Sequence, residues 1–200
     1  MFLFASLNPK SYEDDLLDAE LADRIRNGDS RAFEDLFFKY HTDLNNFAIS
    51  ITKSRELARD GVQDVFFRIW RNKKELNVHN SIRVYIFQAV KNKCLNLIEK
   101  QNNQIKLRDN FRIQQSNKLE IEFNLDSALS VEQQALIKAI WEAVDRMPER
   151  RRMVFYLHRK NGFKYKEIAK ILSISRKTVE NHMGQALKFL RSEIDLKKFE

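Results

Sequence analysis

The chain has 200 residues, and its 43% hydrophobic composition suffices for one large or two small cores. Its four glycines and two prolines, against about 14 and about 10 in an average chain, are too few for the frequent turns of an all-β fold, so we predict an all-α protein. The formal charge is +8, and residues 150–200 alone hold 14 Lys or Arg against five Asp or Glu, a distribution typical of proteins that bind polyanions.

Composition also bears on location and chemistry. No uncharged stretch exceeds nine residues, whereas a membrane-spanning helix needs about 20. The only cysteine is Cys94, and the four histidines lie far apart in sequence, so we expect neither a disulfide nor a bound metal. We therefore expect a cytoplasmic protein without a cofactor.

Apolar residues recur at helical spacing through residues 14–98, which predicts a bundle of four helices. The first helix is acidic and ends at Gly28, a residue type suited to the left-handed position beyond a helix C-terminus. Either Asp29 or Ser30 can cap the second helix. The third and fourth helices are expected over residues 57–72 and 81–98. The apolar side of the third consists of Ala58, Val62, Val65, Phe66, Ile69 and Trp70.

The pattern breaks over residues 101–130, where nine of thirty residues are Asn or Gln. We predict a flexible linker there, long enough to let two flanking domains engage separate sites. The boundaries expected from the sequence are an acidic N-terminal helix over 1–28, a first domain over 29–100, the linker over 101–130 and a second domain over 131–195.

Helical periodicity resumes at Val131 and stops before Met147-Pro148, because the residue before a proline is biased away from the α-helix. A second helix is expected over residues 149–159. A short helix from Tyr165 to Leu172, the turn Ser173-Ile174-Ser175 and a longer helix from Arg176 then have the spacing of a helix-turn-helix.

The longer helix has an apolar side and an opposite polar side that suits the major groove of DNA. We predict that its DNA-contacting residues are Arg176, Lys177, Thr178, Asn181, Gln185 and Lys188. Basic residues that precede the motif are candidates for phosphate contacts. They are Arg150, Arg151, Arg152, Arg159, Lys160 and Lys164.

The fourth helix combines basic residues with aromatic ones, a mixture that suits single-stranded DNA. Its candidate strand-binding residues are Tyr85, Phe87, Lys91, Asn92 and Asn96. There is no phosphate-binding loop, nucleophile elbow or cluster of metal ligands, so we expect a binding protein and not an enzyme.

These motifs together resemble the extracytoplasmic-function sigma factors, the small two-domain initiation subunits of bacterial RNA polymerase. GDSRAFEDLFFKY (Gly28–Tyr40) is similar to the start of sigma region 2, and ARDGVQDVFFRIW (Ala58–Trp70) to its core-binding helix. VYIFQAVKNKCLNLI (Val84–Ile98) resembles the helix that melts DNA and reads the minus-10 element. The segment Ala139–Lys188 resembles region 4, whose helix-turn-helix reads the minus-35 element.

The resemblance implies that the partners are core RNA polymerase, through the clamp of the β′ subunit and the flap of the β subunit, promoter DNA and an anti-sigma factor. The implied core-binding residues are Asp60, Gln63, Asp64, Phe66 and Arg68. Three positions depart from the family pattern: Arg59 replaces a common acid, Asn96 a common aspartate, and Ser173 a common glycine of the turn.

Two other functions are compatible with the sequence. One is a helix-turn-helix regulator that acts without binding core polymerase, which symmetric dimer binding to an operator would support. The other is a helical adaptor whose basic tail binds nothing specific, which loss of all nucleic-acid affinity at moderate salt would support.

Overall fold

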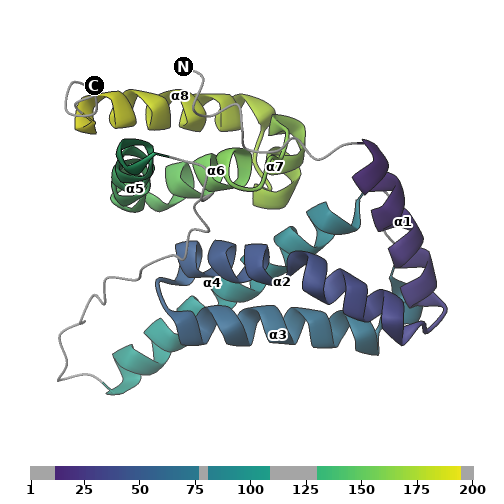
Figure 1. The fold of residues 1–200 in the computed structure, drawn as a ribbon. Helices are drawn as coiled ribbons and strands as arrows, with labels where there is room; N and C mark the ends of the chain where they lie inside the picture. The colour runs from purple at the N-terminus through teal and green to yellow at the C-terminus, as the bar shows by residue number, and fades with distance from the viewer. Residues whose placement is uncertain (1–11, 77–80, 109–129, 195–200) are drawn as a thin grey trace. The chain divides into compact units, whose positions relative to one another are not determined.

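The computed structural model describes residues 12–76, 81–108 and 130–194, and every regular element within these ranges is helical (Figure 1). The chain divides into two compact units, one formed by α1 to α4 and the other by α5, α6, α8 and most of α7. The prediction of an all-α protein with two small domains is confirmed. The helices are α1 (Tyr12–Arg26), α2 (Ser30–Thr52), α3 (Arg55–Arg71), α4 (Ile82–Arg108), α5 (Val131–Asp145), α6 (Glu149–Arg159), α7 (Tyr165–Leu172) and α8 (Arg176–Glu193), with a 3-10 turn η1 (Lys73–Glu75).

Local chemistry separates α1 from α2 at the predicted place. Gly28 has a φ of 90°, a left-handed conformation that favours glycine. Asp29 then caps α2, and its carboxylate accepts hydrogen bonds from the backbone N–H groups of Arg31 and Ala32. The bond from Ala32, together with the one from the Arg24 side chain, lowers the pKa of Asp29. The carboxylate thus stays ionised where the positive end of the helix dipole favours it.

A cluster of aromatic rings joins α2 and α3 in the first unit. The Phe66 ring of α3 meets Phe33 and Phe37 of α2, with ring centroids 6.0 and 4.9 Å apart, and Phe33 also contacts Trp70 at 5.1 Å. Helix α4 packs against both α2 and α3. These ring pairs add specific geometry to the burial of apolar surface between α2 and α3.

Helix α1 is part of this unit and packs against α2. Its Asp18 is buried, and the carboxylate accepts a hydrogen bond from the Tyr40 hydroxyl and pairs with the Lys39 ammonium at 2.7 Å. A buried carboxylate is tolerated when its oxygens are satisfied in this way. The acidic helix is thereby fixed to α2 by a specific polar contact.

Helix α4 continues to Arg108, so the first part of the segment predicted as a linker from residue 101 is helical. Asn and Gln, which suggested a break, are compatible with an exposed helix when the preceding turns are already formed. The rest of the predicted linker, over 109–129, lies outside the described residues.

The second unit is built around Trp141 of α5, whose ring meets Phe155 and Tyr156 of α6 edge-on at 5.9 and 5.6 Å. Helix α6 begins directly after Pro148, and α8 packs against both α5 and α6. The buried Arg152 side chain donates to the backbone carbonyls of Asp145 and Met147. It therefore links the end of α5 and the turn that follows to α6.

Candidate nucleic-acid interface

The helix-turn-helix is formed by α7 and α8, and its turn is held by serines. Ser173 has a φ of 55°, a left-handed conformation that is uncommon for residues other than glycine. This explains why a glycine is typical at this position in the family that the sequence resembles. Ser175 caps α8: its hydroxyl oxygen accepts the backbone N–H of Thr178 at 3.0 Å and lies 2.8 Å from the Thr178 hydroxyl.

Helix α8 separates its two sides clearly. Val179, Met183, Ala186 and Leu190 are buried against the rest of the unit. The opposite side forms a shallow hollow of about 510 Å³. A Cβ placed on Gly184 would meet no atom within 4 Å, so the floor of this hollow is open to an approaching ligand. Besides Gly184 and Glu180, the hollow is lined by Lys177, Thr178, Asn181, Gln185 and Lys188.

The structure therefore brings five of the six predicted recognition residues into one surface, and Arg176 lies at its edge, at the start of α8. The Arg176 Nε atom is 3.0 Å from Glu180 Oε1, and the Gln185 side-chain amide donates to Asn181 Oδ1 at 3.4 Å. Arg176 is among the residues predicted to contact DNA, and an acid on the same helix partly neutralises its charge. Glu180 was not among the predicted site residues, although its i, i+4 spacing from Arg176 is visible in the sequence.

The basic residues before the motif do not form a single set. Arg150 and Lys164 are exposed, whereas Arg152 is buried and bonded to the end of α5. The prediction that Arg152 contacts phosphate is wrong, because its side chain is buried and its guanidinium donates to backbone carbonyls. Its neighbours in the Arg150–Arg151–Arg152 run differ because successive helical residues point 100° apart.

A second candidate site is a groove of about 400 Å³ between α3 and α4. Tyr85, Asn92 and Asn96 of α4 line it, and all three are exposed. Its polar lining is completed by Asp64, Arg68, Lys93 and Lys100. Aromatic, amide and cationic groups are the side chains that stack on, read and neutralise an unpaired nucleic-acid strand.

Two other predicted strand-binding residues lie elsewhere. The Phe87 side chain is 0% exposed and its ring packs 5.4 Å from that of Phe47 on α2. The Lys91 side chain is also buried. The expectation that both are exposed is wrong, because α4 has neighbours on more than one side. The groove instead contains Lys93 and Lys100, which lie about one and three turns beyond Ala89 on the same side of α4 and follow helical spacing in the sequence.

The core-binding residues implied by the resemblance differ in their exposure to solvent. Asp60, Gln63 and Arg68 are exposed on α3, but Phe66 is 3% exposed and belongs to the aromatic core. The assignment of Phe66 to a docking surface is therefore wrong. The adjacent Phe67 is 60% exposed and lies 5.5 Å below the Arg71 guanidinium. Its position outside the apolar stripe was the sequence signal that could have identified it.

Asp64 links α3 to α4. Its two carboxylate oxygens pair with Arg68 Nε at 2.7 Å on the same helix and with Lys93 Nζ at 2.9 Å on α4. Behind this pair, Gly61 approaches Cys94 so closely that a Cβ would lie 3.2 Å from the sulfur. Burial raises the pKa of the Cys94 thiol to about 12, so it is an inert packing group.

None of the helices within residues 12–76, 81–108 and 130–194 is both long and apolar enough to cross a membrane.

Comparison with known families gives two matches. The model for sigma-70 region 2 matches residues 36–104, and that for sigma-70 region 4 matches residues 137–190. The ECF RNA polymerase sigma factor SigM of Bacillus subtilis (strain 168) is 21% identical over 160 residues, which cover 80% of this chain and 93% of SigM. SigX of the same organism, also an ECF RNA polymerase sigma factor, is 24% identical over 176 residues, covering 82% and 84% of the two chains.

Two solved structures share the fold. CnrH, in complex with the cytosolic domain of CnrY, superposes with a TM-score of 0.61 at 22% identity, over 88% of this chain and 96% of CnrH. RpoE, in complex with the anti-sigma factor NepR from Bartonella quintana, gives a TM-score of 0.63 at 18% identity, over 80% and 94%.

The two units are thus the sigma-70 region 2 and region 4 domains, and the chain is a sigma factor of RNA polymerase. It belongs to the extracytoplasmic-function sigma factors, which direct transcription initiation with RNA polymerase and are not themselves enzymes.

Proposed function

We propose that this sigma factor binds core polymerase through the exposed face of α3, holds the melted minus-10 strand in the α3–α4 groove and reads the minus-35 element with α8. The observation that carries the proposal is the hollow on α8, where side chains able to pair with bases surround an open glycine. Such a surface suits the edge of a base pair in the major groove.

For core binding, we infer that the clamp of the β′ subunit contacts Asp60, Gln63, Phe67 and Arg68. Phe67 is 60% exposed, and exposed aromatic rings are enriched at protein interfaces. Asp64 has a different role in this proposal, because its carboxylate is already paired with Lys93 and Arg68. It holds α4 against α3 and so positions the docking face relative to the groove. The flap of the β subunit remains the proposed partner of region 4.

For opening of the duplex, we infer that Tyr85 stacks on an unpaired base while Asn92 and Asn96 bond to base edges. Lys93 and Lys100 supply the cations that follow the strand backbone. Phe87 and Lys91 are not part of this site in the proposal, since both are buried.

For the domain boundaries, we extend the polymerase-binding and minus-10 part, expected over residues 29–100, to Arg108 and keep residues 131–195 as the minus-35 part. Helix α1 joins the first part, because Asp18 attaches it to α2. The start of the linker moves from residue 101 to beyond Arg108, where α4 ends.

We further propose that an anti-sigma factor regulates this protein. The support is that both structural neighbours were solved as complexes, CnrH with CnrY and RpoE with the anti-sigma factor NepR. A pull-down from the native cell with the tagged protein, followed by binding of the purified candidate in competition with core polymerase, tests this.

The experiment that tests the central proposal is run-off transcription on a promoter library with purified bacterial core polymerase, with and without this protein. We expect specific transcripts only when both are present. Symmetric binding of the protein alone to DNA, without core binding, would instead indicate a regulator. Loss of all DNA affinity at moderate salt, with or without core, would indicate an adaptor.

A further inference from the structure

One acid lies on a surface that is otherwise suited to a polyanion. Glu180 is the single acidic residue among the side chains lining the hollow of α8, beside Lys177 and Lys188. A carboxylate cannot bond to phosphate and lowers the affinity of a basic helix for DNA of any sequence. Its presence therefore weakens binding unless it contacts a base.

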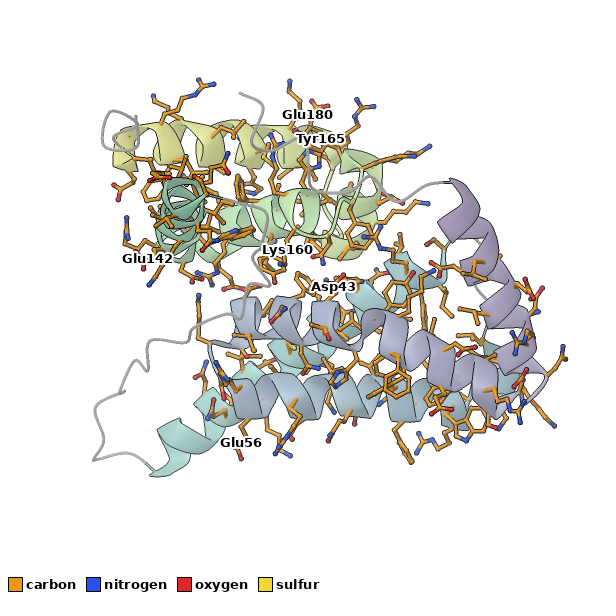
Figure 2. The ribbon with its side chains drawn as sticks, in the orientation of Figure 1. Asp43, Glu56, Glu142, Lys160, Tyr165 and Glu180 are labelled. Atoms are coloured by element: carbon orange, nitrogen blue, oxygen red, sulfur yellow. The ribbon has the colours of Figure 1, made fainter. Side chains whose placement is uncertain are left out.

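The geometry makes such a contact feasible. Glu180 lies one turn after Arg176 and one turn before the open Gly184, on the strip of α8 that borders the hollow. Figure 2 shows Glu180 on the outer side of α8, away from Glu142 on α5. Its Oε1 atom pairs with Arg176 Nε at 3.0 Å. The guanidinium offsets the charge of the carboxylate and orients it, which reduces repulsion from the phosphates on either side of the groove.

Base chemistry then selects the ligand. In the major groove, a carboxylate can only accept hydrogen bonds, and the characteristic donor for Glu or Asp is the N4 amino group of cytosine. We propose that Glu180 is a specificity-determining residue that selects cytosine at one position of the upstream promoter element, with Arg176 as its positioning residue. This inference rests on the proposed minus-35 function of α8.

The test is a promoter-library selection on holoenzyme carrying the wild-type protein, Glu180→Ala or Glu180→Gln. We expect cytosine to be enriched at one upstream position with the wild type, and that enrichment to fall by roughly tenfold with either variant, as for one lost base contact. With Gln, adenine should become enriched at the same position, because an amide pairs with adenine N6 and N7. Both variants should also steepen the salt dependence of binding, because Arg176 becomes free for phosphate.

Glu142→Gln is the matched control. Glu142 is an exposed acid on α5 of the same unit, so this substitution removes the same charge away from the hollow. It should leave the selected sequence unchanged. Cytosine enrichment that persists in Glu180→Ala, even with a higher overall affinity, would overturn the inference while leaving the proposed function intact. Failure of wild-type holoenzyme to select any upstream sequence would overturn both.

Discussion

Helices α8 and α4 are both proposed to hold DNA, yet they differ in how many neighbours cover them. Helix α8 buries one apolar stripe against α5 and α6 and leaves its opposite side exposed. Helix α4 packs against α1, α2 and α3, and even polar side chains such as Arg83 and Lys91 are buried on it. The comparison teaches that periodicity locates a binding face on a helix covered from one side, and fails on a helix covered from several.

The largest effect is expected inside the region 2 core, where two adjacent phenylalanines have opposite roles. Phe66→Ala removes a buried ring and should lower the free energy of unfolding by about 3–5 kcal/mol. Phe67→Ala should change it by less than about 0.5 kcal/mol but weaken core polymerase binding by about 2 kcal/mol. Denaturant unfolding and titration with core polymerase measure the two effects. Equal destabilisation by both variants would contradict the division between core and docking face.

The next prediction separates docking from helix packing. We expect the polymerase surface opposite Asp60 to be basic, so Asp60→Arg should weaken core binding by up to several kcal/mol without changing the melting temperature. Asp64→Arg should weaken binding too, and should also lower unfolding free energy by about 1–2 kcal/mol because the ion pair with Lys93 is lost. An unchanged melting temperature for Asp64→Arg would show that this pair does not hold α4.

A third prediction tests the groove against the buried side of α4. Asn92→Ala should make the free energy of open-complex formation less favourable by about 1–3 kcal/mol and should affect the free energy of initial promoter binding less. The reason is that only a melted strand exposes base edges to the groove. Permanganate reactivity of unpaired thymines reports the difference. Phe87→Leu is the comparison. It should lower the free energy of unfolding of the protein, and the protein that remains folded should open promoter DNA as the wild type does. Normal opening of promoter DNA by the Asn92→Ala variant would show that the groove does not bind the melted strand.

On α8, Asn181→Ala or Gln185→Ala should each change the preferred upstream bases, at a cost of about 1–3 kcal/mol on the preferred sequence. Their effects should not add, because the two amides are hydrogen-bonded to each other. Arg176→Ala should weaken binding to DNA of any sequence and reduce the salt slope by less than about one unit, since Glu180 already neutralises part of its charge. Because Arg176 orients the Glu180 carboxylate in the further inference, this variant should also reduce the enrichment of cytosine at the position assigned to Glu180. Promoter-library selections decide this, and an unchanged preference in the Asn181/Gln185 double variant would mean that another face enters the groove.

The smallest expected effect concerns pH. Burial, with added repulsion from Arg150 and Arg151, lowers the pKa of His182 below the ordinary value of 6.5. The fold therefore favours the neutral imidazole, and the associated stability is present above about pH 6.5 and is lost as the pH falls below it. The melting temperature of the full chain should fall between about pH 7.5 and about pH 5.5, and by less in His182→Gln. Identical pH profiles for the two proteins would remove this histidine as the cause.

Local sequence determined most helix boundaries. The bounds of α6 and α7 agree with the predicted segments 149–159 and Tyr165–Leu172. Pro148 precedes α6, and the left-handed residues Gly162 and Ser173 follow α6 and α7, so each bound is set by near neighbours in the sequence. The exposed face of α8 also followed from the sequence, since a single apolar stripe fixes which side is buried. Periodicity likewise placed Phe66 in the core stripe, and it was the family resemblance that moved this residue to the docking face in error.

Tertiary structure decided which of the remaining side chains are exposed. In each case the side chain contacts either a residue that is distant in sequence or a backbone group, and hydrophobic periodicity contains no information on such contacts. Phe87 is buried because Phe47 of α2 packs against it. Asp64 connects α3 to α4 because its carboxylate forms an ion pair with Lys93. Arg152 turns inward because its guanidinium donates hydrogen bonds to the backbone carbonyls of Asp145 and Met147. A periodic pattern records how often a position is apolar, whereas these side chains are held by hydrogen bonds, ion pairs and ring contacts that only the packed helices supply.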